Sequence, residues 1–228
     1  MKTLYLIPAR GGSKGIPGKN LKLFAGKPLI SYSIELARQF ASDDNICLST
    51  DDTIIAAIAE GMGLVVPFLR PSVLASDTAS TNDVILHAIN YYESLGRKYD
   101  AIVLLQPTSP FRQAFHLKEA LELYSENVDL VMSVKLTDAN PYFVLFEENE
   151  MGLLEKSKTG NFTRRQDCPD VWQVNGAIYI YNVKSLIENK PLDCRTLKYV
   201  MESRYSVDLD TELDWQFAEF LNAEMKLL

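Results

Sequence analysis

The chain has 228 residues, enough for one large α/β domain or for one domain with a small appendage. Hydrophobic residues make up 47% of it and charged residues 23%, which is ordinary for a globular protein in water. The formal net charge is −7, because 23 lysines and arginines face 30 acidic residues. This charge argues against a surface that coats nucleic acid, so we expect no nucleic-acid partner.

The cysteines and the apolar runs indicate which structural class and compartment to expect. Cys47, Cys168 and Cys194 are widely spaced and form no Cys-x-x-Cys pair, which indicates neither a zinc site nor a disulfide framework. No apolar run approaches the roughly 18 residues that a membrane span needs. The N-terminus leads straight into a strand pattern rather than a signal peptide. We therefore expect a cytoplasmic protein without a membrane partner.

The first predicted strand, Thr3–Ile7, runs into a glycine-rich loop that carries three cations. Glycine lets backbone N–H groups curl around an anion, and Arg10, Lys14 and Lys19 add donors and charge for phosphate oxygens. The glycine spacing matches neither a Walker loop nor the Gly-x-Gly-x-x-Gly dinucleotide fingerprint. We interpret the loop as a triphosphate cradle, and an ordinary glycine-rich turn is the alternative.

Further short apolar runs alternate with helical patterns along the chain. Strands are predicted at 46–49, 101–105, 130–134 and 177–181, and helices around 84–92 and 117–124 and from about 211 onward. This alternation predicts an α/β fold with a doubly wound, mainly parallel sheet. Such sheets bind ligands beyond the carboxyl ends of their strands, so the loops after Ile7, Ser49 and Leu105 should face one crevice.

Two loops between these elements carry polar motifs. In the segment 69–81, Arg70 precedes a run of helix N-cap formers, at least one of which should cap the helix that contains Val84. In the segment 105–112, two prolines stiffen the loop after a strand. Gln106 at this strand end can offer a ligand both a donor and an acceptor, although a merely rigid turn is an equal alternative.

The pattern changes after about Asn140. Residues 141–170 are aromatic, then acidic, then basic, and we interpret them as an arm inserted out of the main sheet. Within it, Leu145–Glu150 is predicted to form a hairpin arm with Glu147–Asn149 as the turn. Exposed aromatic residues usually need a partner surface, which favours dimerisation, and a cover over the domain's own core is the alternative. Arg165 in the basic part could simply be solvated.

Two acidic residues near the C-terminus, Asp208 and Asp210, alternate with apolar Val207 and Leu209. On an extended strand the i and i+2 side chains point the same way, so both carboxylates should face one point. Two such charges repel unless a cation lies between them, and Mg²⁺ suits carboxylate, water and phosphate oxygens. The alternative is that Asp210 or Thr211 only caps the last helix, in which Leu213, Phe217, Phe220 and Leu221 share a face.

In this order, the motifs resemble those of the CMP-sialic acid synthetases, or acylneuraminate cytidylyltransferases. The matching segments are 6–20, 69–81, Gln-Pro-Thr-Ser-Pro at 106–110, 163–179 and Asp-x-Asp-Thr-Glu-x-Asp at 208–214. The resemblance implies a single Rossmann-like domain over residues 1–228, of the nucleotide-diphospho-sugar transferase type. It also implies transfer of CMP from CTP to the anomeric hydroxyl of a nine-carbon 2-keto sugar acid, with release of pyrophosphate.

The resemblance assigns roles residue by residue. Arg10, Lys19, Asp208 and Asp210 would be catalytic, and the two aspartates would hold Mg²⁺. Residues expected to bind CTP are Ala9, Arg10, Gly11, Gly12, Ser13, Lys14, Lys19, Asn20, Arg70, Ala79, Ser80 and Thr81. Residues expected to bind the sugar acid are Gln106, Thr108, Ser109, Arg165, Gln173 and Asn175. A homodimer formed through the 141–170 arm is also expected.

Two departures from the resemblance concern the sugar. The segment Asn140–Phe143 lacks the basic residue of neuraminate-specific relatives, and Gln173 stands where they have arginine. The loss of two cations suggests a different sugar acid, such as legionaminate or pseudaminate. The alternatives are a 3-deoxy-manno-octulosonate cytidylyltransferase and a non-catalytic nucleotide-binding protein on the same fold.

Overall fold

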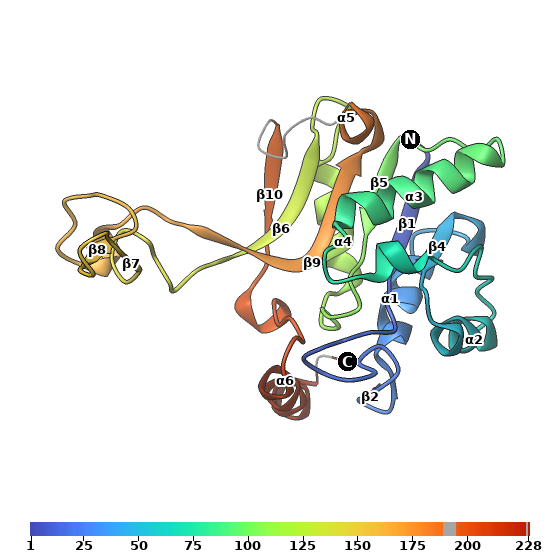
Figure 1. The fold of residues 1–228 in the computed structure, drawn as a ribbon, viewed down its shortest axis with the longest axis horizontal. Helices are drawn as coiled ribbons and strands as arrows, with labels where there is room; N and C mark the ends of the chain where they lie inside the picture. Colours follow the sequence, from blue (N-terminus) through green and yellow to red (C-terminus); the bar gives the residue numbers. More distant parts are fainter. Residues whose placement is uncertain (189–194, 227) are drawn as a thin grey trace.

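The computed structural model describes residues 1–188, 195–226 and 228, so Cys194 lies outside the described residues. Its centre is a six-stranded sheet in the order β10-β6-β9-β5-β1-β4 (Figure 1). The strands of this sheet are β1 (Thr3–Pro8), β4 (Ile46–Ser49), β5 (Ala101–Leu104), β6 (Leu130–Leu136), β9 (Trp172–Asn182) and β10 (Thr196–Val200). Only β9 pairs antiparallel, with β5 and β6, so the predicted mainly parallel sheet is confirmed among these strands.

Helices cover both faces of the sheet. The helices on these faces are α1 (Leu29–Arg38), α2 (Thr53–Gly61), α3 (Thr81–Ser94), α4 (Ala114–Leu123) and α5 (Val183–Ile187). The last helix, α6 (Glu212–Met225), packs in a separate cluster. Single 3₁₀ turns occupy Asp43–Asn45, Ser72–Ala75, Arg165–Asp167 and Ser203–Tyr205. Among the described residues, no helix combines the length and apolar character that crossing a membrane would require.

The alternation of side chains along β1 shows how the two layers form. Tyr5 and Ile7 join the core cluster that contains residues of α1, α2 and α4, whereas Leu4 and Leu6 join the cluster of α3 and α5. Successive strand side chains point to opposite faces, so an all-apolar strand must be covered on both. This arrangement confirms the doubly wound α/β fold.

A third cluster ties the C-terminal helix to the first loop of the chain. Trp215 and Ala218 of α6 are buried there against Ile16 and Phe24, the latter on the short β2 (Leu23–Phe24), which pairs with β3 (Lys27–Pro28). The Phe24 and Trp215 rings meet edge to face, with centroids 5.3 Å apart. The predicted start of α6 is confirmed, because Thr211 is its N-cap and accepts a hydrogen bond from the Asp214 N–H.

The apolar face of α6 recognised in the sequence is mostly not the buried one. Leu213, Phe217 and Phe220 are exposed, and only Leu221 of that set packs against the third cluster. The helix instead buries its Trp215 side. Periodicity identified an apolar stripe, but the position of the core relative to the helix decided which side is covered.

The arm leaves the sheet between β6 and β9 and carries the hairpin of β7 (Phe146–Glu148) and β8 (Leu154–Lys156). The turn predicted at Glu147–Asn149 is wrong, since both glutamates pair within the hairpin strands. The turn lies at 149–153, where the Asn149 side chain accepts N–H groups and Gly152 has φ +76°. Asparagine and glycine suit such backbone conformations, which explains the later turn.

The arm extends away from the body of the domain (Figure 1). No residue of 141–170, all of which are described, belongs to the three core clusters. Its exposed apolar side chains are Val144, Leu145, Phe146, Met151, Leu153 and Leu154. The arm therefore does not cover the domain's own core, contrary to the alternative considered from the sequence.

The two sides of α6 predict contrasting stability effects. Trp215→Ala should lower the free energy of unfolding by about 3 to 5 kcal/mol, because it removes a buried aromatic side chain. Phe220→Ala should change it by less than about 0.5 kcal/mol, because Phe220 is 60% exposed. Urea denaturation of both variants at one protein concentration tests this. Equal losses would contradict the assignment of the buried face.

Candidate functional site

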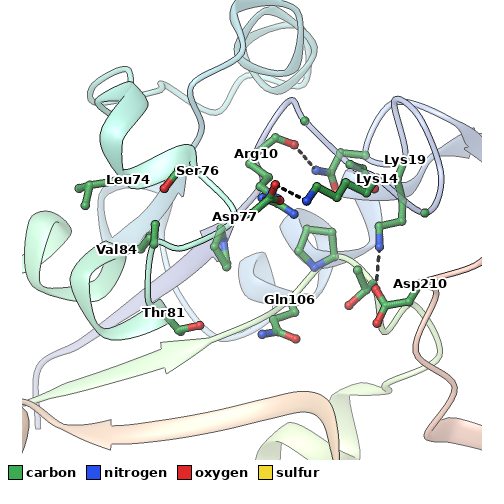
Figure 2. A pocket seen from close by; sticks show the side chains of 18 of the residues that line it. Arg10, Lys14, Lys19, Leu74, Ser76, Asp77, Thr81, Val84, Gln106 and Asp210 are labelled. Atoms are coloured by element: carbon green, nitrogen blue, oxygen red, sulfur yellow. Dashed lines mark hydrogen bonds and ion pairs between the residues drawn. The ribbon is translucent and has the colours of Figure 1, made fainter.

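A cavity of about 530 Å³ opens at the carboxyl ends of β1 and β5 (Figure 2). Its walls come from the loop after β1, the segment between α2 and α3, the loop after β5, and the segment after β10. The predicted site residues that line it are Arg10, Gly12, Ser13, Lys14, Lys19, Asn20, Arg70, Ala79, Ser80, Thr81, Gln106, Thr108, Asp208 and Asp210. The structure thus brings four separate sequence motifs together.

The glycine-rich loop is fixed by hydrogen bonds at its start. The Asn20 side-chain amide donates to the Arg10 carbonyl at 3.0 Å, and the Gly11 N–H donates to the Asp51 carboxylate at 3.0 Å. Asp51 follows β4, so the loop after Ser49 supports the cavity from behind its lining. Ala9 and Gly11 belong to the loop but not to the lining residues.

The far end of the loop contacts the acidic segment. Lys19 is buried, and its ammonium donates to the Leu209 carbonyl at 2.6 Å and to the Asp210 carboxylate at 3.0 Å. Gly15 lies so close that a Cβ atom there would be 1.9 Å from the Asp210 carbonyl oxygen. A side chain at this position would force the two segments apart, so glycine is required for their contact.

The Asp208 carboxyl group is suited to a cation. Its Oδ1 is buried and has no hydrogen-bond partner among the described residues. Burial raises the pKa of Asp208, opposed by a hydrogen bond with Thr108, while the nearby charge of Asp210 raises it further. A divalent cation beside this oxygen and Asp210 would compensate both charges, so the residues present fit a metal.

A metal here could draw only part of its ligand set from the protein. Within 1–188, 195–226 and 228, no group of three or more His, Cys, Asp or Glu side chains could hold a metal ion. Asp208 and Asp210 would therefore need water and substrate oxygens to complete the shell. Mg²⁺ is commonly held in this way, by one or two carboxylates together with phosphates.

Arg70 forms part of the opposite wall of the cavity. Its side chain is 4% exposed and lies 3.6 Å from the Asp51 carboxylate, while its Nε and Nη2 have no hydrogen-bond partner among the described residues. Burial lowers the pKa of Arg70, and Asp51 opposes that shift. Nearby, Ser80 caps α3 by accepting the Asp83 N–H at 3.1 Å, which confirms the expected cap.

Asp77 is a site residue that sequence reasoning treated only as a helix-cap former. Its carboxylate lies 2.8 Å from Arg10 Nη1 and 2.6 Å from Lys14 Nζ (Figure 2). Hydrogen bonds from Lys14 and Arg10 lower the pKa of Asp77. One feature of the sequence could have revealed this role. Asp77 is an acidic residue in the segment 69–81, which was assigned to the same ligand as the cationic loop.

A second cavity of about 300 Å³ adjoins the first and shares Ser80, Thr81 and Gln106 with it. Its remaining lining residues are Asn82, Leu104, Tyr179 and Tyr181. The two tyrosine rings stack with centroids 6.1 Å apart and an interplanar angle of 19°. The sequence predicted a buried strand at 177–181, but a site role for Tyr179 and Tyr181, which share one face of it, was not predicted.

Several predicted site residues lie outside both cavities. Arg165 pairs with Asp138 at the base of the arm, and Gln173 lies 3.5 Å from the hydroxyl of Thr137. Ser109 is fully buried and lines neither cavity. The geometry of this chain therefore does not place Arg165, Gln173 or Ser109 against a ligand in its own site.

The Asn175 side chain is buried and forms its hydrogen bonds within the protein rather than facing a cavity. Its carbonyl oxygen accepts from Ser133 at 2.6 Å, and its amide donates to Ser206 at 2.9 Å. Ser206 begins the segment that carries Asp208. Asn175 thus connects β6, β9 and the acidic segment, which makes it a positioning residue.

Arg112, at the end of the proline-containing loop, supports the floor of the site. Its guanidinium donates to the carbonyls of Gln106 at 2.6 Å and Ala177 at 2.9 Å. Burial lowers the pKa of Arg112 to about 9, and the charge of Asp208 opposes the shift, so the group is cationic at neutral pH. Gly176 has φ +74°, and a Cβ there would approach Gln106 and Asp208 to 3.1 and 3.2 Å.

Comparison with known proteins agrees with this geometry. The family model described as Cytidylyltransferase matches residues 4–210. The chain is 34% identical to the CMP-N,N'-diacetyllegionaminic acid synthase of Legionella pneumophila, over 97% of this chain and 96% of that protein. It is 35% identical to the pseudaminic acid cytidylyltransferase of Campylobacter jejuni, again over 97% and 96%.

The fold is also similar to a solved structure of CMP:2-keto-3-deoxy-manno-octonic acid synthetase complexed with CTP. The TM-score is 0.72 at 18% identity, over 98% of this chain and 99% of that one, so the likeness concerns the fold alone. The family match, by contrast, spans nearly all of the described sheet and every cavity motif. The chain belongs to the cytidylyltransferase family.

Proposed function

We propose that this enzyme transfers CMP from CTP to the anomeric hydroxyl of a nine-carbon 2-keto sugar acid and releases pyrophosphate. The observation that carries the proposal is the meeting of the cationic glycine loop with Asp208 and Asp210 in one cavity. Phosphoryl-transfer sites need this combination, because catalysis depends on positioning and on neutralising the charge that develops on phosphate oxygens.

The walls of the cavity indicate how CTP would lie. The loop of residues 10–15 provides backbone N–H groups with Arg10 and Lys14 for the two outer phosphates. Arg70 and the segment 76–81 form the opposite wall, where small side chains and backbone groups could read the cytosine edge. Lys19 lies between the loop and Asp210, a position from which its ammonium can offset charge at the α-phosphate.

We further propose that Asp208 and Asp210 hold Mg²⁺. Bound Mg²⁺ would neutralise triphosphate charge and so favour departure of pyrophosphate. The unpartnered Asp208 Oδ1 supports this role. Lys19, which pairs with Asp210 in this structure, would then turn its charge toward the phosphates.

The second cavity is the candidate acceptor site. It adjoins the proposed nucleotide site through Gln106, so an acceptor hydroxyl there would be near the α-phosphate. Tyr179 and Tyr181 give one wall an aromatic surface, which suits the methyl groups of a sugar that carries acetamido substituents. One relative is named for legionaminic acid and another for pseudaminic acid, which supports an acceptor of this kind.

A homodimer would explain the arm. The hairpin exposes an apolar surface far from the domain's own core, and Arg165 lies outside its own chain's cavities. We propose that the arms of two chains pack on each other's domains. Arg165 would then lie close to the partner's acceptor site.

The first prediction concerns the reaction. With CTP and Mg²⁺, we expect pyrophosphate release with di-N-acetyllegionaminate or pseudaminate at a higher kcat/KM than with N-acetylneuraminate. 3-Deoxy-manno-octulosonate, the acceptor of the alternative enzyme, should give no release above background. A coupled pyrophosphate assay measures kcat/KM for all four sugar acids. If N-acetylneuraminate is the best substrate, the sugar assignment is wrong. If no acceptor gives pyrophosphate release, the proposed reaction is wrong.

The second prediction concerns the acidic pair. Asp210→Asn should reduce turnover by at least ~10²-fold, on the scale of losing one preorganised electrostatic group. The control is Glu212→Gln, two residues away, whose carboxylate pairs with Lys22 rather than lining the cavity. Near-normal turnover of Asp210→Asn would refute the metal assignment.

The third prediction concerns assembly. Sedimentation at micromolar concentration should show a dimer, and Leu154→Asp should shift it toward monomer, since Leu154 is 70% exposed on the hairpin. The thermal midpoint of the isolated chain should change little, because this side chain contacts no core cluster. A wild-type monomer would rule the dimer out.

A further inference from the structure

The two cations nearest the start of the glycine loop are already paired with a carboxylate. Arg10 donates to Asp77 Oδ1 at 2.8 Å, and Lys14 contacts Asp77 Oδ2 at 2.6 Å. Figure 2 shows Asp77 between these two side chains, inside the cavity that all three line. Each carboxylate oxygen therefore serves one cation, much as two phosphate oxygens would.

We propose that Asp77 exchanges with polyphosphate for Arg10 and Lys14, holding both cations before CTP binds and taking them back as pyrophosphate leaves. This inference rests on the proposed function. Carboxylates and phosphates use the same charge-assisted donors, so CTP would compete with Asp77 for one existing contact of each cation. Asp77 is thus a positioning residue that acts through the phosphate-binding side chains.

The exposure of the three groups makes such an exchange easy. The side chains of Arg10, Lys14 and Asp77 are 37%, 80% and 47% exposed. Ion pairs this open to water are weak, so a triphosphate can displace the carboxylate. The competition still reduces apparent affinity, because only the fraction of molecules with free cations is ready for the ligand.

The backbone around Asp77 keeps its carboxylate within reach. On one side, Ser76 donates to the Val73 carbonyl at 3.1 Å, and on the other Ser80 caps α3. The segment is therefore anchored at both ends, and release of the carboxylate needs only rotation of a side chain. After transfer, the same carboxylate is ready to compete with pyrophosphate for the loop.

A purely structural role for Asp77 predicts the opposite sign. If Asp77 only tied the segment 76–80 to the glycine loop, its removal would loosen both walls and weaken ligand binding. If it competes with phosphate, its removal frees Arg10 and Lys14 and strengthens binding. The direction of the change in affinity therefore distinguishes the two roles.

The test is calorimetric titration of pyrophosphate and of CTP into the full-length chain. Asp77→Asn should bind both about three- to tenfold more tightly, which is the scale of losing two exposed ion pairs. Asp77→Glu keeps the carboxylate and should resemble the wild type. Glu93→Gln removes one negative charge from the exposed far end of α3 and controls for net charge.

Steady-state kinetics adds an independent readout. Asp77→Asn should lower the KM for CTP and the inhibition constant for pyrophosphate, and kcat should not rise, since product release is slower. Unchanged or weaker binding by Asp77→Asn, with wild-type binding intact, would overturn the inference alone. A wild-type chain that does not bind CTP would instead overturn the proposed function.

Discussion

The contact between Lys19 and the segment 209–210 is the constraint on which the site depends. The ammonium of Lys19 reaches the Leu209 carbonyl and the Asp210 carboxylate across 190 and 191 positions of sequence. Gly15 lets the two backbones approach, and Trp215 anchors the following helix against the first loop. Without this closure, the cationic loop and the acidic pair would belong to separate surfaces.

The electrostatics of the cavity follow from that closure. Lys19 pairs with Asp210, Arg70 lies opposite Asp51, and Asp77 holds two cations of the loop. Among the described residues, buried Asp208 keeps an oxygen without a partner. The exposed pairs of Asp77 and the unpartnered oxygen of Asp208 would let this site exchange partners for a triphosphate and a cation. Such an exchange would allow an acidic protein to bind a highly charged anion.

The sequence predicted the fold well because the sheet is encoded locally. Buried parallel strands are short, nearly all-apolar runs, and those at 3–7, 46–49 and 101–105 could be read directly. The antiparallel direction of β9 could not be predicted, because it depends on the path of the arm. The burial of Trp215 on α6 likewise depends on where the core lies, not on the helical period.

Site residues could be predicted from the sequence where a whole motif lies within one loop. The loops after the neighbouring strands β1 and β5 meet at one edge of the sheet, as expected. Residues 208–210 also line this cavity, as the resemblance implied, although β10, the strand before them, is not a neighbour of β1. Asn175 was assigned to a ligand, whereas its amide forms hydrogen bonds with the buried hydroxyl groups of Ser133 on β6 and Ser206 in the acidic segment. The pairing of Asp77 was missed because its partners lie more than 60 positions away, and no local pattern signals such a contact.

The most direct test of the central claim is a crystal structure with CTP and Mn²⁺, read by anomalous scattering. The account predicts a metal peak in contact with Asp208 Oδ1 and the Asp210 carboxylate, beside a triphosphate that lies along the loop of residues 10–19. Lys19 should then face the α-phosphate. A metal peak beyond reach of both carboxylates, or a triphosphate bound away from the loop, would contradict it.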